Sequence, residues 1–159
     1  MTVEFRKAVV PDDIGALCDF DRRVFGAYPE DLFSPKDWAE LESYWMVANG
    51  DTIGCLALKP DVDYDEEPRP GCLYIESTGI LPKYQRQGFG ARMKEWQIEY
   101  ARQHGFGLIV TNARQSNISS IGLNQKFGFR TREIVPDYYS EPDEPAVVME
   151  LEVCAVPST

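Results

Sequence analysis

Residues 73–92 read LYIESTGILPKYQRQGFGAR, and this stretch decides the fold. It begins with an extended apolar run typical of a strand and ends where an amphipathic stretch typical of a helix begins. Two glycines between them, Gly88 and Gly90, allow a ligand to approach the backbone closely. The first N–H groups of a helix are unpaired, and the helix dipole adds about half a positive charge there. The stretch therefore predicts an anion-binding turn between a strand and a helix.

The residues around this turn exclude two common nucleotide-binding loops. A Walker loop requires Gly-Lys followed by Ser or Thr, whereas Gly90 is followed by Ala91 and Arg92. A dinucleotide-binding fingerprint requires a third glycine where this chain has Met93. From these residues alone, a purely structural glycine turn remains an equal alternative to a phosphate site.

The spacing that remains, Gln85-x-x-Gly88-x-Gly90 after a strand and Pro82-x-Tyr84, resembles the acetyl-CoA signature of the GCN5-related N-acetyltransferase (GNAT) superfamily. A second segment, residues 117–129, reads NISSIGLNQKFGF. It resembles the asparagine-capped helix ending in Lys-x-Gly-Phe that is the other hallmark of this superfamily. Two hallmarks in this order are more specific than either alone, and the resemblance covers about residues 73–153.

The resemblance implies a mixed α/β fold with a twisted central sheet of about six or seven strands and helices on both faces. It implies transfer of an acetyl group from acetyl-CoA to a primary amine of a small molecule or of a peptide or protein N-terminus, by direct attack in a ternary complex. Acetyl-CoA is the implied co-substrate, and the transfer requires no metal. The alternative is a non-catalytic acyl-CoA-binding regulatory module. Homodimers are common in such families, so a homodimer is a possible assembly.

The resemblance also implies where the cofactor binds. The turn from Gln87 to Ala91 would cradle the CoA pyrophosphate. The strand before it would be splayed from its neighbour at a β-bulge, so that its backbone binds the pantetheine and polarises the thioester carbonyl. The implied cofactor contacts are Gly79, Ile80, Leu81, Gln85, Arg86, Gln87, Gly88, Phe89, Gly90, Ala91, Asn117, Ser120, Asn124 and Lys126.

Glu76 is the candidate general base, because it lies upstream of the turn on the same strand and can act through a water molecule. In a regular strand its side chain would lie on the same face as those of Thr78 and Ile80, but a β-bulge between them would change this. An ordinary strand glutamate paired with a cation is an equal alternative.

The chain departs from the family pattern at two positions. Asn124 stands where many relatives have the tyrosine that protonates the departing thiolate. Asn112 stands where the enzymes that acetylate ribosomal-protein alanine have a glutamate. The missing tyrosine favours the regulatory alternative, but a thiol with a pKa near ~8.5 leaves as thiolate with little help.

Aromatic residues in two segments are candidates for contact with the acceptor. Phe25 and Tyr28 follow the first predicted helix, in the segment that forms one wall of the acceptor cleft in the superfamily. Tyr138 and Tyr139 lie in an acidic loop expected between closing strands at 130–135 and 146–153. Either tyrosine is also a candidate to replace the missing acid. Core packing is the alternative for the first pair.

The remaining elements predict core packing and exposed surface. A helix is expected at about 88–104, with a core-facing stripe of Phe89, Met93 and Trp96 and with Lys94 off the stripe. The acidic segment 59–71 is expected to be a solvated hairpin loop. Its D-x-D-x-D spacing does not predict a calcium site, because Glu66 stands at the glycine position of such a loop and Cys72 at the position of the bidentate glutamate.

Length and composition predict one domain over residues 1–159. Four widely spaced cysteines and one histidine favour free thiols over a zinc site. The net charge of −10 disfavours nucleic acid and anionic membranes as partners and fits a cationic or neutral acceptor. Because there is no apolar run of the ~20 residues that a membrane span requires and no signal segment, we expect a cytoplasmic protein.

Overall fold

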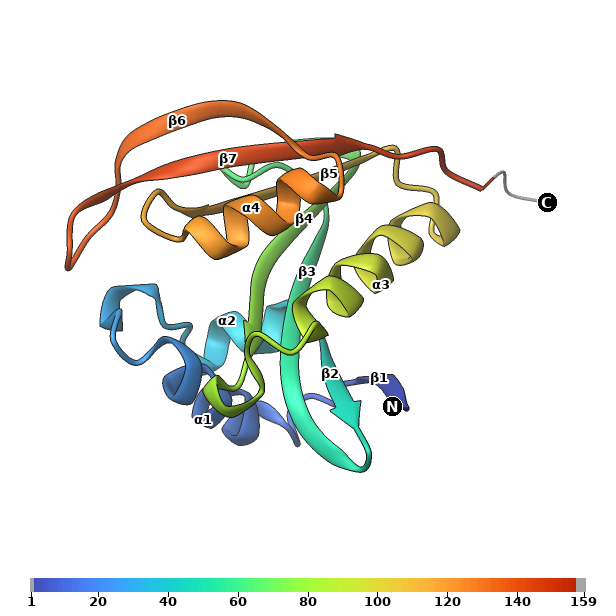
Figure 1. Cartoon of the computed structure of the whole chain (residues 1–159), viewed down its shortest axis with the longest axis vertical. Coiled ribbons are helices and arrows are strands. Elements are labelled where there is room, and N and C mark those ends of the chain that lie inside the picture. Colours follow the sequence, from blue (N-terminus) through green and yellow to red (C-terminus); the bar gives the residue numbers. More distant parts are fainter. Residues whose placement is uncertain (1, 157–159) are drawn as a thin grey trace.

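The computed structural model describes residues 2–156 and contains a seven-stranded sheet with the order β1-β2-β3-β4-β5-β7-β6 (Figure 1). The strands are β1 (Val3–Lys7), β2 (Glu42–Ala48), β3 (Asp51–Val62), β4 (Pro68–Ile80), β5 (Leu108–Arg114), β6 (Arg130–Tyr139) and β7 (Glu144–Glu152). The helices are α1 (Ile14–Phe25), α2 (Pro35–Glu40), α3 (Phe89–Gln103) and α4 (Ile118–Lys126), with short 3-10 turns η1 (Pro29–Asp31) and η2 (Pro82–Tyr84). The predicted mixed α/β fold with six or seven strands is confirmed.

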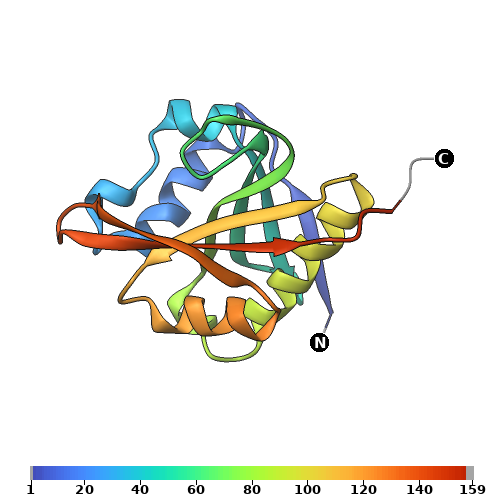
Figure 2. The ribbon, with the colours of Figure 1, turned by 90° about the horizontal axis from the view of Figure 1, so that it is seen from above.

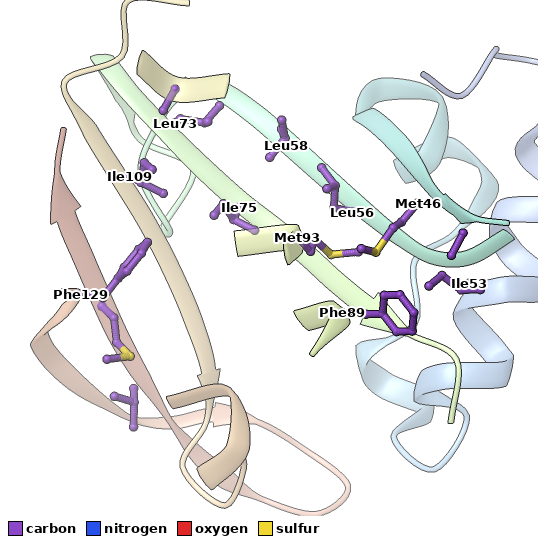
Figure 3. Packing of buried hydrophobic residues seen from close by; sticks show 14 residues of the cluster. Met46, Ile53, Leu56, Leu58, Leu73, Ile75, Phe89, Met93, Ile109 and Phe129 are labelled. Atoms are coloured by element: carbon purple, nitrogen blue, oxygen red, sulfur yellow. The ribbon is translucent and has the colours of Figure 1, made fainter. Parts of the chain in front are cut away.

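Helices cover both faces of the sheet, as predicted (Figure 2). Side chains alternate along β3: Leu56 and Leu58 belong to a core under α3, whereas Cys55 and Ala57 belong to a core under α1 and α2. Figure 3 shows the first core, in which Met93 of α3 lies against side chains of the sheet. The sheet is therefore a rigid layer that holds the two groups of helices in fixed positions.

The sheet opens between β4 and β5, the one neighbouring pair that runs parallel. These strands pair only from Cys72 to Ile75 and from Leu108 to Thr111, and beyond that they diverge (Figure 1). On the other side of β4, Ile75 and Ser77 pair with consecutive residues of β3, so Glu76 is the extra residue of a β-bulge. The splayed, bulged strand that the resemblance implied is present.

Local sequence signals set the ends of two helices near this opening. Ser34 caps α2 in a capping box with Asp37, and Pro35 is the first helical residue. The Asn117 side chain accepts a hydrogen bond from the Ser120 N–H and caps α4. Gly128 after α4 has φ +92°, a left-handed conformation that favours glycine.

Three expectations for individual segments were wrong. β3 and β4 extend into the segment 59–71, which is therefore mostly strand, and Asp63 in its short loop is buried. β6 extends to Tyr139, so the two tyrosines end a strand and do not lie in a loop. Lys94 is buried although it lies off the stripe, because α4 covers that side of α3.

Two absences concern the described residues only. Over residues 2–156, no helix is both long and apolar enough to cross a membrane. Within the same range, no group of three or more histidine, cysteine, aspartate or glutamate side chains is placed to hold a metal ion.

Candidate functional site

A cavity of about 1220 Å³ lies where β4 and β5 diverge. The segment after α1, the bulged part of β4, the glycine turn, the end of β5, α4 and the end of β6 all contribute to its lining. The predicted site residues that line it are Glu76, Gly79, Ile80, Gln85, Arg86, Gly88, Gly90, Ala91, Asn117, Ser120, Asn124, Lys126, Phe25, Tyr28, Tyr138 and Tyr139. The fold thus places the expected cofactor turn, base and acceptor residues around one space.

Three of the residues predicted to contact the cofactor do not line the cavity. Leu81 and Phe89 are buried in the two hydrophobic cores, and neither lines the cavity. The Leu81 N–H donates to the Ile53 carbonyl at 2.9 Å, so the expectation that this backbone donor binds the cofactor was wrong. Gln87 does not line the cavity either, and its side chain donates to the Lys83 carbonyl at 3.0 Å.

The glycine turn is held by its own side chains. Gln85 Nε2 donates to the Ile80 carbonyl at 2.9 Å, which ties the turn back to the end of β4. Arg86 and Gly88 both have positive φ angles, and Gly88 immediately precedes α3. A Cβ atom on Gly90 would lie 3.3 Å from Leu123 of α4. Because Gly90 has no side chain, α3 and α4 can pack closely beside the cavity. The absence of a side chain also keeps this edge of the cavity open.

Glu76 lines this cavity and also a smaller one of about 210 Å³. Its Oε2 atom is buried and has no hydrogen-bond partner among the described residues. Burial, together with the negative charge of Glu66, raises the pKa of Glu76 to about 7. The nearby Lys59 forms its ion pair with Glu66, at 2.8 Å. Among the described residues no cation forms an ion pair with Glu76, although the charge of Lys59 partly offsets the rise in its pKa.

The bulge also changes the face on which Glu76 lies. Thr78 accepts a hydrogen bond from Gln97 of α3, at 3.1 Å, and so faces α3. Glu76 instead lines the small cavity together with Phe33 and Leu41, on the side of α2. The bulge thus shifts Glu76 away from the face of Thr78 and Ile80, as the sequence reasoning allowed, because the extra residue reverses the alternation.

Two functional candidates that sequence reasoning did not identify are Tyr74 of β4 and Asn112 of β5. The Tyr74 hydroxyl donates to Asn112 Oδ1, and Asn112 Nδ2 donates to the Tyr139 hydroxyl oxygen at 2.7 Å. Because Tyr139 accepts this bond, its own hydrogen is available to a group in the cavity. The Asn112 side chain thus orients the hydroxyl groups of Tyr74 and Tyr139. An asparagine in the sequence does not by itself indicate such a role.

Burial raises the pKa of Tyr74, Tyr138 and Tyr139 above the ordinary value of 10. Each phenol therefore stays neutral near neutral pH. A phenol of raised pKa is a poor source of protons for a thiolate whose own conjugate acid has a pKa near ~8.5. The geometry favours positioning roles for Tyr138 and Tyr139 over replacement of the missing acid.

Two buried polar side chains line the cavity beside α4. The Lys94 ammonium lies 5.0 Å from the centre of the Phe129 ring, and burial lowers its pKa to about 7. Asn124 is also buried, with its Nδ2 at 3.7 Å from Met149 Sδ. Because Lys94 lies off the apolar stripe of its helix, the sequence pattern gave no signal of its burial.

The end of the cavity beside α1 and η1 is acidic. Asp21, Glu30, Asp31 and Glu76 all line it. Asp21 is buried and accepts a hydrogen bond from the Phe33 N–H at 2.9 Å. Arg114 is the cation at this end, and Asp31 and Glu144 neutralise it at 2.8 Å and 3.0 Å. The remaining carboxylates make this end favourable for a cationic group.

The chain matches known proteins in sequence. The family model described as the acetyltransferase (GNAT) family matches residues 15–129. N-alpha-acetyltransferase 50 of Danio rerio is 30% identical over 132 residues, which cover 82% of this chain and 77% of that protein. The [ribosomal protein bS18]-alanine N-acetyltransferase of Escherichia coli (strain K12) is 34% identical over 79 residues, 48% of this chain and 53% of that protein. The second match therefore spans about half of each protein.

Solved structures share the fold. The ribosomal-protein-S18-alanine N-acetyltransferase from Escherichia coli superimposes with a TM-score of 0.79, covers 99% of this chain and 97% of its own, and is 20% identical. An acetyltransferase from Bacillus subtilis in complex with CoA has a TM-score of 0.76, with 96% and 99% coverage and 20% identity. At this identity the likeness establishes a common architecture.

Proposed function

The chain belongs to the acetyltransferase (GNAT) family, and we propose that the amine it acetylates is the α-amino group of a peptide or protein N-terminus. The chain transfers an acetyl group from acetyl-CoA to an amine. The names of the two sequence relatives support the finer assignment, since one is an N-alpha-acetyltransferase and the other acts on the alanine of a ribosomal protein.

The raised pKa of the buried Glu76 is the observation that carries this proposal. A general base works best when its pKa lies near the operating pH, and it has the least to do when the amine itself loses its proton near that pH. The pKa of Glu76, about 7, is near the ~7.7–8.0 of an α-amine and far below the ~10.4 of a lysine side chain. The site is therefore better matched to an α-amine than to a lysine side chain.

The proposed reaction uses the two ends of the cavity. The turn from Gln85 to Ala91 binds the CoA pyrophosphate, and the unpaired edge of β4 near Gly79 and Ile80 holds the pantetheine and the thioester. The acceptor lies between Phe25, Tyr28 and the Tyr138–Tyr139 pair. Glu76 takes the proton of the amine through a water molecule, the nitrogen attacks the thioester carbon, the C–N bond forms, and the C–S bond breaks. CoA leaves as the thiolate and takes up, through solvent, the second proton that the nitrogen loses as the amide forms.

A small cationic amine is the second candidate acceptor, and one observation favours it. The acceptor end of the cavity carries the carboxylates of Asp21, Glu30 and Glu76. A polyamine or a similar molecule would be attracted by this charge without needing the peptide backbone.

The test is a comparison of acceptors with matched chemistry. We would measure thiol release from acetyl-CoA with three acceptors: a short peptide with a free N-terminus, the same peptide with that terminus blocked and one lysine added, and a polyamine. The proposal predicts the highest kcat/KM for the free N-terminus. A higher value for the polyamine would replace the proposal by the second candidate.

A cofactor titration separates failure of the acceptor assignment from failure of the enzyme assignment. CoA at about 100 times its Kd adds about 2.7 kcal/mol to the free energy of unfolding, which corresponds to a Tm rise of about 5–10 °C. Stabilisation by CoA without thiol release for any amine would favour the non-catalytic acyl-CoA-binding module. No stabilisation would contradict both assignments.

A further inference from the structure

Arg114, at the end of β5, is buried at the outer end of the cavity, with only 6% of its side chain exposed. Nε and Nη2 donate to the two carboxylate oxygens of Asp31, at 2.8 Å and 2.9 Å. Nη1 donates to Glu144 at 3.0 Å and to the Pro142 carbonyl at 2.8 Å, and Nη2 also donates to the Ser140 carbonyl at 3.0 Å. The guanidinium is thus held by a planar, largely bidentate set of acceptors.

These bonds join two connecting segments that are distant in the sequence. Asp31 belongs to η1, between α1 and α2, and lies 83 positions from Arg114. Ser140 and Pro142 belong to the turn between β6 and β7. The η1 segment and this turn lie on the same side of the molecule in both ribbon views (Figures 1 and 2). Connecting segments vary in position more readily than strands, so the strand residue Arg114 fixes both of them.

The same guanidinium lies between two aromatic rings of the candidate acceptor site. Its central carbon is 4.5 Å from the centre of the Tyr28 ring and 4.6 Å from the centre of the Tyr139 ring. One ring comes from the segment before η1 and the other from the end of β6. The cation–π contacts hold each ring against Arg114, and so set the position of one ring relative to the other.

The positive charge of Arg114 is neutralised by Asp31 and Glu144. Two carboxylates accept its hydrogen bonds, and these bonds raise its pKa still further above the ordinary value, despite burial. It therefore has no net positive charge left with which to attract a phosphate or a carboxylate ligand. Its contribution to the cavity is geometric.

We propose that Arg114 is a positioning residue for the acceptor: by holding Tyr28 and Tyr139 at a fixed separation, it sets the width of the acceptor cleft. The proposal rests on the assignment of these two tyrosines to the acceptor site. It does not depend on whether the acceptor is a peptide or a small amine.

Arg114→Lys is the main test variant, because it keeps the charge and removes the planar fork and the stacking. We expect the KM of the acceptor to rise about tenfold, which corresponds to the loss of about 1.4 kcal/mol of binding. The KM of acetyl-CoA and the Tm shift produced by CoA are expected to stay within twofold of the parent values. The measurement is of steady-state rates with the concentrations of acetyl-CoA and of the acceptor both varied, using whichever amine the parent protein acetylates best.

Arg132→Lys is the matched control. Arg132 bridges two carboxylates, Asp63 and Glu150, in the same sheet, and it does not line the cavity. Its replacement breaks a partly buried arginine–carboxylate network of the same kind, so we expect a lower Tm with an unchanged acceptor KM. Asp31→Asn is the second variant, because it weakens the fork from the other side and is expected to raise the acceptor KM in the same direction.

The outcomes separate positioning from stability. A rise in acceptor KM for Arg114→Lys and Asp31→Asn, but not for Arg132→Lys, supports the proposal. An unchanged acceptor KM in Arg114→Lys overturns it, and so does an equal rise in the KM values of both substrates. If Arg114→Lys does not fold, Asp31→Asn decides by the same criteria. Failure of the parent to prefer a free N-terminus affects the proposed function only.

Discussion

At the scale of single residues, the bulge in β4 gives Glu76 its chemistry. A carboxylate is buried in folded proteins mainly when a cation or several donors satisfy it. Glu76 keeps one buried oxygen without a partner among residues 2–156, and burial together with the charge of Glu66 raises its pKa to about 7. A group with this pKa exists in both protonation states near neutral pH, as a general base must.

Glu76→Gln is expected to lower kcat/KM by roughly 10²–10⁴-fold, the usual contribution of a general base. The loss is expected to be larger for a lysine-like amine than for an α-amine, because the α-amine loses its proton more easily. Parent kcat/KM should rise with pH and level off above about 7, and the variant should lack this inflection. Glu95→Gln, on the exposed face of α3, is the control. Equal rates in variant and parent for both amine classes would reject Glu76 as the base.

The same substitution has a second, independent readout in stability. The folded-state pKa of Glu76 is raised from an ordinary 4.5 to about 7. The native state therefore binds more protons than the unfolded state between these values, and the contribution of this group to stability is lost as pH rises from about 4.5 to about 7. Glu76→Gln should consequently raise Tm more at pH 8 than at pH 5. A Tm difference that is the same at both pH values would contradict the raised pKa.

At the scale of elements, the glycine turn depends on a left-handed residue immediately before α3. Gly88 has φ +86°, and no atom outside its immediate neighbours would contact a Cβ there, so backbone strain is the main cost of adding a side chain. That strain is about 1–2 kcal/mol for an alanine. The turn can relieve it by changing its backbone angles, which would displace the N–H groups proposed to bind the pyrophosphate.

Gly88→Ala is therefore expected to raise the KM of acetyl-CoA several-fold, up to about tenfold, while the acceptor KM stays unchanged. Gly105→Ala provides a matched control, because Gly105 has φ +80° and equally open surroundings and does not line the cavity. The control should lose a similar amount of stability without a change in either KM. If Gly88→Ala and Gly105→Ala had the same acetyl-CoA KM, the turn would not be the cofactor site.

At the scale of the whole molecule, charge networks join strands that β-sheet pairing leaves apart. Asp63, between β3 and β4, is bonded to Arg69 at 2.6 Å and to Arg132 of β6 at 2.9 Å. Burial alone would raise the pKa of Asp63, but the hydrogen bonds from the two arginines lower it below the ordinary 3.8. The network connects the β3–β4 hairpin with β6, on the two sides of the short parallel pairing between β4 and β5.

The sign of the shift predicts acid sensitivity. A lowered folded-state pKa stabilises the protein above the ordinary value, and this stabilisation is lost as pH falls from about 3.8 through the folded-state value. Asp63→Asn should lower the free energy of unfolding by about 1–3 kcal/mol at pH 7, and by less at pH 3. Urea unfolding at both pH values measures this, with the exposed Asp143→Asn as control. An equal loss at pH 7 and pH 3 would show that the charge of Asp63 does not matter.

Much of the fold follows from local signals in the sequence. The order of elements, the caps at Ser34 and Asn117, the left-handed Gly128 and the turn at Gly88 are each encoded within a few neighbouring residues. Such signals work because hydrogen bonds to helix ends and left-handed angles involve only adjacent parts of the chain. The strand, turn and helix around Gly88, where we propose that the cofactor binds, were predictable for this reason.

The acceptor end was less predictable, because its properties arise between distant segments. Lys94 is buried because α4 lies against one side of α3, and Tyr138 and Tyr139 leave the expected loop because β6 pairs further along β7 than its hydrophobicity indicates. The hydrogen bonds of Asn112 to two tyrosines depend on how β4, β5 and β6 meet.

The sequence was enough to place a strand, a glycine turn and a helix in succession, with a second capped helix after them and Glu76 upstream of the turn. Only the tertiary structure decided which way Glu76 faces, that its oxygen lacks a partner among the described residues, and that Arg114 stands between Tyr28 and Tyr139. The reason is physical. Backbone conformation depends on near neighbours, whereas burial and charge pairing depend on side chains that are brought together from as far as 83 positions away.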